Sequence, residues 1–236
     1  MLETLIVVTS ADRLDAEHLT GVWLDEYAIP FTALCEAGVA LTVASSRGGP
    51  APIDPKTAPD AAATARWRIA LDALASTKTL AEVAGERFDA VLLPGGHGPL
   101  VDLAGDADLA ALVTRLAGEG AIVAALCHGA AGLLGATGKD GLPLVRGRKL
   151  TAFTNGEETL SGLQTFVPFL LETRLRDQGA VFEHALLPTA GHVVRDGLLV
   201  TGQNPASSEA LARCLIEALG ERQRAALTGE PAAAPI

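Results

Sequence analysis

Short aliphatic runs bounded by turn residues recur along the chain and alternate with longer stretches of helical periodicity. Four of these runs predict strands, at residues 4–10, 39–45, 88–93 and 121–126. Apolar side chains continue through them without a polar alternation, which is typical of parallel strands covered on both faces. The runs therefore predict the centre of a parallel sheet.

Helical patterns fill the intervals between these runs. Helices are predicted at residues 23–38, 61–75, 79–84 and 106–120. The resulting β-α-β-α order predicts an α/β fold, with a doubly wound, mostly parallel sheet sandwiched by helices.

The second half of the chain continues in the same manner. Strands are predicted at 148–153 and 181–187 and in a hairpin at 193–202, and helices at 165–180 and 204–219. Because no repeat or linker divides the sequence, we expect one domain over residues 1–222. Residues 223–236 are expected to form a flexible tail.

Composition narrows the possible partners. The 236 residues carry a formal net charge of −10 and show no basic cluster, which argues against nucleic acid and against an anionic membrane surface. No apolar run approaches the ~20 residues that span a bilayer, and the first residues lack the pattern of a signal peptide. A cytoplasmic protein is expected.

The sequence AALCHGAAGLL (124–134) holds the first candidate for chemistry. Cys127 and His128 stand where a predicted strand passes into a helix among small residues, the geometry of a nucleophile elbow. A helix N-terminus would lower the pKa of the thiol and enrich the reactive thiolate. The alternative is a buried cysteine that packs as a small apolar side chain, which is the interpretation favoured for Cys35 and Cys214. Three cysteines without a CxxC pair argue against disulfides and a structural zinc site.

Two further features could carry chemistry, namely a glycine turn and a set of acidic residues. In LLPGGHG (92–98) a strand runs into glycines whose backbone N–H groups could stabilise an oxyanion, although a glycine turn without a ligand is an equal alternative. Glu26 lies on an amphipathic helix, where it is either solvated or buried with a raised pKa. Glu157 and Glu158 occupy what looks like the first turn of another helix.

Five motifs in this order resemble the DJ-1/PfpI superfamily, and more closely its Hsp31-like branch of glutathione-independent glyoxalases (glyoxalase III) and stress chaperones. The motifs are TGVWLDEYAIPF, LLPGGHG, AALCHGAAGLL, LTAFTNGEET and LVTGQNPASS. The resemblance covers about residues 5–219. It implies a flavodoxin-like, class I glutamine amidotransferase-like fold and an insert at about 46–85, which shorter members lack.

The resemblance also implies roles for particular residues. Cys127 would be the nucleophile, His128 its partner, and Glu158 the acid that orients His128, with Glu157 as the alternative. Glu26 would bond the thiol. The backbone N–H groups of Gly96 and His128 would bind an oxyanion, and His97 would face the substrate.

The implied activity is conversion of methylglyoxal and related 2-oxoaldehydes into 2-hydroxy acids through a cysteine hemithioacetal. The resemblance implies no cofactor and no metal, since the ligands of the zinc site of some bacterial relatives are not evident here. It further implies a homodimer. The alternatives are a cysteine hydrolase (peptidase, amidase or deglycase) and a holdase chaperone or redox sensor.

Overall fold

The computed structural model describes residues 1–228 and contains a seven-stranded sheet in the order β3-β2-β1-β4-β5-β9-β8. Neighbouring strands are parallel except for β8, which runs antiparallel to β9. The strands of this sheet are β1 (Glu3–Val8), β2 (Ala40–Ser45), β3 (Lys78–Thr79), β4 (Ala90–Leu93), β5 (Ile122–Leu126), β8 (Val193–Asp196) and β9 (Leu199–Gly202). The predicted doubly wound, mostly parallel sheet is confirmed.

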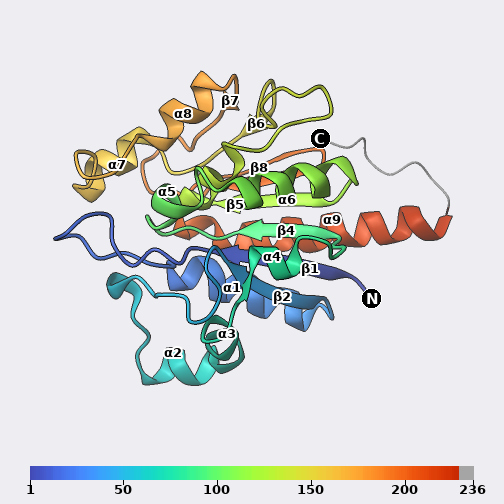
Figure 1. Cartoon of the computed structure of the whole chain (residues 1–236), viewed down its shortest axis with the longest axis horizontal. Coiled ribbons are helices and arrows are strands. Elements are labelled where there is room, and N and C mark those ends of the chain that lie inside the picture. The colour runs from blue at the N-terminus through green and yellow to red at the C-terminus, as the bar shows by residue number, and fades with distance from the viewer. Residues whose placement is uncertain (229–236) are drawn as a thin grey trace.

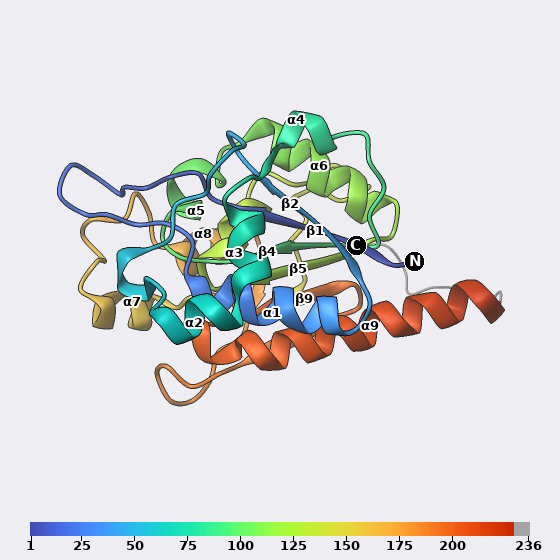
Figure 2. The ribbon, with the colours of Figure 1, turned by 90° about the horizontal axis from the view of Figure 1, so that it is seen from below.

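Helices cover both faces of the sheet. Helix α1 packs beside α9 on one face, whereas α4 and α6 pack together on the other (Figures 1 and 2). The helices are α1 (Leu24–Glu36), α2 (Ala61–Arg66), α3 (Arg68–Leu74), α4 (Leu80–Val83), α5 (Pro99–Asp102), α6 (Ala107–Gly118), α7 (Asn155–Ser161), α8 (Leu171–Asp177) and α9 (Ser208–Thr228), with 3-10 turns η1 (Pro55–Thr57), η2 (Cys127–Leu133) and η3 (Pro205–Ser207). Strands β1, β4 and β5 are buried almost throughout because they lie between these layers.

The strand order reverses its direction of growth between β1 and β4. The chain builds outward from β1 through β2 to β3, then returns to place β4 on the other side of β1. In open α/β sheets, ligands bind at such a switch point, beyond the carboxyl ends of the strands. The glycine turn follows β4, Cys127 follows β5, and Glu26 lies on the helix that comes after β1.

The predicted insert, residues 46–85, contains η1, α2, α3, β3 and α4. It contacts the chain just before and at the start of α1, since Val22 N donates to Pro52 O (2.8 Å) and Leu24 N donates to Thr57 Oγ1 (3.1 Å). The insert thereby supports the helix that carries Glu26.

Several sequence predictions need correction. The helix predicted at 61–75 is interrupted at Trp67, which caps both α2 and α3. The helix predicted at 165–180 begins only at Leu171, because Pro168 disfavours helical backbone before it.

The strands predicted at 148–153 and 181–187 shrink to β6 (Lys149–Leu150) and β7 (Val181–Phe182), which form a separate two-stranded sheet. The segment after Cys127 is 3-10 rather than α-helical. Helix α9 continues past residue 222 to Thr228, so the tail prediction is wrong for that stretch, and residues 229–236 lie outside the described part.

Cys35 is exposed and Cys214 partly exposed, so neither is the fully buried side chain that was expected. No helix within residues 1–228 combines the length and the apolar character needed to cross a membrane.

Candidate active site

Cys127 sits in the sharp turn that joins β5 to η2. Its φ of 56° is one of two positive values at non-glycine residues in the described chain, and its side chain is buried. Gly129 makes this turn possible, because a Cβ there would lie 2.7 Å from Pro94 O. A positive φ at a residue between a strand and a helical turn is typical of a nucleophile elbow. The structure therefore gives Cys127 the backbone geometry that the sequence predicted.

His128 links Cys127 to an acid. Its Nδ1 lies 3.5 Å from Cys127 Sγ, and its Nε2 lies 2.7 Å from Glu158 Oε2. Burial, followed by the nearby His97, lowers the pKa of His128 to about 4. His128 is therefore a neutral base at physiological pH, with a free nitrogen available for the thiol proton.

Glu158 is the acid of this chain of contacts. Burial alone would raise its pKa, but hydrogen bonds from His128 and His97 outweigh burial and hold the pKa of Glu158 well below its usual range. An ionised carboxylate only accepts hydrogen bonds, so Nε2 of His128 carries the proton and Nδ1 presents its lone pair to Cys127.

Glu157 faces a different set of partners, although it precedes Glu158 directly. Its carboxylate accepts hydrogen bonds from Asn204 Nδ2 (2.7 Å) and Gln203 Nε2 (3.0 Å) and completes a capping box with Thr154. The sequence left both glutamates open as partners of His128. In the structure, Glu158 meets His128 and Glu157 ties the start of α7 to the chain that follows β9.

Glu26 approaches Cys127 from α1. Burial raises the pKa of Glu26 to about 8, and its polar neighbours are Cys127 and the backbone of Gly95. Within residues 1–228, neither carboxyl oxygen of Glu26 has a hydrogen-bond partner. Gly95 allows this approach, since a Cβ there would collide with Glu26 Oε2 and lie 2.8 Å from Cys127 Cβ. A protonated carboxyl thus faces the Cys127 thiol near neutral pH.

The thiol pKa differs from the sequence prediction. Burial, with a further contribution from Glu26, raises the pKa of Cys127 well above its ordinary value, whereas the helix-terminus argument predicted a lowered one. Desolvation of a fully buried thiolate outweighs the dipole of a short 3-10 turn. The resting group is therefore a thiol.

The glycine turn after β4 lies beside this elbow. Gly96 has a φ of 97°, and a Cβ there would be 2.8 Å from Trp23 N, so only glycine fits. The backbone N–H of His128 faces Cys127 Sγ. The predicted donors Gly96 and His128 therefore lie on the two turns beside Cys127.

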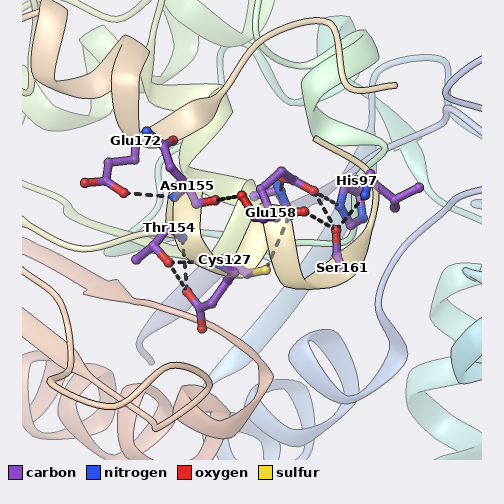
Figure 3. A network of polar contacts seen from close by, with 11 residues as sticks. His97, Cys127, Thr154, Asn155, Glu158, Ser161 and Glu172 are labelled. Carbon is purple, nitrogen blue, oxygen red and sulfur yellow. Dashed lines mark hydrogen bonds and ion pairs between the residues drawn. The ribbon is translucent and has the colours of Figure 1, made fainter. Parts of the chain in front are cut away.

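Sequence reasoning missed the partner of His97. Its Nε2 lies 2.9 Å from Glu158 Oε1, and Ser161 Oγ donates to the same oxygen over 3.0 Å (Figure 3). Ser161 offered a weak signal, because it lies three residues after Glu158 on a predicted helix. The contact of His97 with Glu158 joins residues far apart in sequence and had no such signal.

In the described part of the chain, one group of side chains has the composition of a metal site. It consists of His97, His128 and Glu158, whose ligand atoms lie within 4.8 Å of one another. The Nε2 atoms of His97 and His128, however, lie at hydrogen-bond distance from different oxygens of the Glu158 carboxylate. A bound ion would need all three lone pairs to converge on one point, about 2 Å from each. The observed arrangement shares protons and does not fit an ion.

Comparison with known proteins agrees with this fold. The chain matches the model of the DJ-1/PfpI family over residues 18–218, and it belongs to this family. Glutathione-independent glyoxalase HSP31 of Saccharomyces cerevisiae is 34% identical over 151 residues, which make up 62% of this chain and 64% of that protein. The match thus spans slightly under two thirds of HSP31.

Three further matches cover more than nine tenths of this chain. Glyoxalase 3 of Candida albicans is 27% identical over 236 residues, or 92% of this chain and 98% of that protein. The X-ray structure of Rapid Encystment Protein 24 KDa from Francisella tularensis has a TM-score of 0.86 at 29% identity and covers 93% of this chain and 99% of that one. The crystal structure of glyoxalase III from Candida albicans, at 24% identity and a TM-score of 0.82 with 92% and 96% coverage, shows the same fold. The predicted family and its Hsp31-like branch are confirmed.

Proposed function

We propose that this protein is a glutathione-independent glyoxalase, a lyase that converts methylglyoxal and related 2-oxoaldehydes into 2-hydroxy acids. One observation carries the proposal: a continuous line of contacts runs from Cys127 through His128 to Glu158, with the protonated Glu26 beside the sulfur. The names of the relatives HSP31 and Glyoxalase 3 support the same activity.

The first step is attack by the nucleophile. Nδ1 of His128 accepts the thiol proton while Cys127 Sγ bonds to the aldehyde carbon, and Glu158 stabilises the resulting imidazolium. The backbone N–H groups of Gly96 and His128 stabilise the oxyanion until it takes the proton back from His128. The product is a hemithioacetal, and the protein's own thiol takes the place of glutathione.

The second step moves a proton between neighbouring carbons. His128 removes the hydrogen from the former aldehyde carbon and returns the proton to the adjacent carbonyl carbon through an enediol, since Glu26 is already protonated and cannot act as the base. The former aldehyde carbon is oxidised as its neighbour is reduced, so no external oxidant is required. Water then hydrolyses the thioester, which releases the 2-hydroxy acid and restores the thiol.

Purified protein and methylglyoxal without glutathione test this proposal, with lactate as the measured product. Wild type and Cys35→Ala should both form lactate over many turnovers, whereas Cys127→Ala should form none. Cys35→Ala is the matched control because it removes an exposed thiol that could trap the aldehyde without turnover. Lactate formation by Cys127→Ala would refute the mechanism.

If no variant forms lactate, the glyoxalase proposal fails, and amide substrates and aggregation assays would test the hydrolase and holdase alternatives. A homodimer in the cytoplasm completes the proposal on the basis of the family resemblance. Sedimentation equilibrium and cell fractionation measure these two properties directly.

A further inference from the structure

One carboxylate serves two imidazoles in this site. Glu158 Oε2 meets Nε2 of His128 at 2.7 Å, and Glu158 Oε1 meets Nε2 of His97 at 2.9 Å. The three residues come from different parts of the fold, namely the turn after β5, the turn after β4 and helix α7. All three side chains are buried.

The two imidazole rings also pack against each other. Their centroids are 4.1 Å apart with an angle of 37° between the planes, and the ring of Phe153 lies 4.5 Å from that of His128. Packing of this kind restricts rotation of both rings. Each ring thus keeps its Nε2 directed at its own oxygen of Glu158.

Ser161 cannot replace His97 as an anchor of the carboxylate. Its hydroxyl also reaches Glu158 Oε1, but it lies on the same short helix as Glu158 and moves with it. His97 belongs to the turn that continues β4, a central strand. Among residues 1–228, His97 is the residue that ties Oε1 of Glu158 to the sheet, from which Cys127 and His128 also project.

We propose that His97 is a positioning residue that acts through Glu158. By holding Oε1, it fixes the orientation of the carboxylate so that Oε2 stays on His128 Nε2, and it thereby keeps the proton of His128 on Nε2 and Nδ1 free for Cys127. The effect of this role on catalysis rests on the proposed function. The role differs from the substrate-facing one that the family resemblance implied for His97.

The surrounding charges agree with this role. The titratable groups beside His128 are Cys127 on η2, Glu158 on α7 and His97. Glu157 acts on His128 only through its more distant charge, and Glu26 on α1 acts on Cys127. A carboxylate that accepts hydrogen bonds from two imidazoles stabilises the charged form of either one less than a carboxylate that serves a single imidazole. Without His97 we therefore expect His128 to bind a proton more readily.

Nuclear magnetic resonance of ¹⁵N-labelled protein tests the proposal without any substrate. Long-range ¹H–¹⁵N spectra report which ring nitrogen of His128 carries the proton, and a pH titration reports the midpoint. His97→Phe removes the donor and keeps a ring, His97→Gln retains an N–H that can reach Glu158, and His97→Asn is too short to reach it. His184→Gln is the matched control, since His184 is exposed and outside the site.

Wild type, His97→Gln and His184→Gln should show a single Nε2–H form of His128. His97→Phe and His97→Asn should show a mixture of the two forms, with the His128 midpoint raised by about 1 pH unit. If His97→Phe does not fold, the difference between the His128 spectra of His97→Asn and His97→Gln tests the proposal. Unchanged His128 spectra in both His97→Phe and His97→Asn would overturn the proposal.

Enzyme kinetics supply a second, separate readout. His97→Phe should lower kcat by about 10- to 100-fold with KM little changed, and His97→Gln should restore most of the loss. Because the spectra need no turnover, a protein without glyoxalase activity would contradict the proposed function and leave the spectroscopic test of His97 intact.

Discussion

Replacement of Glu26 by glutamine should change how the stability of the protein depends on pH. Glu26 is fully buried on α1, and burial raises the pKa of its carboxyl from 4.5 to about 8. Between these two values the folded protein keeps the carboxyl proton, whereas the unfolded chain releases it. Folding therefore becomes less favourable as the pH rises through this window.

The size of the effect follows from the pKa difference. One pKa unit corresponds to about 1.4 kcal/mol, so wild type should lose about 2.5 kcal/mol of unfolding free energy between pH 5 and pH 7 through Glu26 alone. Glu26→Gln has no titrating group at this position and should lack this loss. The thiol of Cys127 titrates above this window, because burial raises its pKa as well.

Equilibrium unfolding in guanidinium chloride at pH 5, 6 and 7 measures the difference between the two proteins. The stability of Glu26→Gln relative to wild type should increase steadily with pH by the amount above. Glu36→Gln is the matched control, because Glu36 is exposed at the end of the same helix and its replacement should follow wild type. A constant difference between wild type and Glu26→Gln over this range would refute a neutral, buried Glu26.

Two further substitutions test the packing that supports the site. Gly95→Ala should lower stability by about 1–3 kcal/mol and activity with it, because the new methyl overlaps Glu26 and Cys127, whereas Gly85→Ala has open space and should lower neither. Asn204→Ala leaves one oxygen of Glu157 without its donor and should cost about 1–3 kcal/mol, measured as a lower Tm. An unchanged Tm in Asn204→Ala would contradict the anchoring role of Glu157.

The sequence predicted the sheet well because burial on both faces leaves a strong local signal. Strands β4 and β5 contain only apolar residues. Uninterrupted apolar runs of this length are typical of strands buried on both faces. The hairpin of β8 and β9 was equally visible, since it turns at Gly197, which has a φ of 63°.

Other elements depended on contacts that no local pattern reveals. The break between α2 and α3 falls at Trp67, whose buried side chain belongs to the hydrophobic core. The predicted strand at 148–153 ends early because Thr151 N donates to the side chain of Thr201 and Phe153 turns to pack on His128. In both places a tertiary contact decides against the local propensity.

The candidate site shows the same division between local and distant information. Cys127 and His128 are neighbours in sequence, so their pairing and the elbow could be inferred from a single motif. The choice between Glu157 and Glu158 required the direction of α7, because consecutive residues on a helix point about 100° apart. The raised pKa values of Glu26 and Cys127 depend on burial by distant segments, which also explains why the helix-terminus argument gave the wrong sign for the thiol.

These distant contributions determine how the nucleophile is activated. A thiol with a raised pKa, a neutral imidazole and a neutral carboxyl keep Cys127 uncharged and unreactive in the resting protein. In the proposed mechanism, proton transfer to His128 creates the thiolate only when a carbonyl carbon is in place to receive it, and the ionised Glu158 stabilises the charge that His128 acquires. Such coupling of proton transfer to attack limits reaction of Cys127 with oxidants, since the thiolate is the form that they attack. The burial that raises the pKa of the Cys127 thiol is therefore an argument for the proposed catalyst and against a redox sensor.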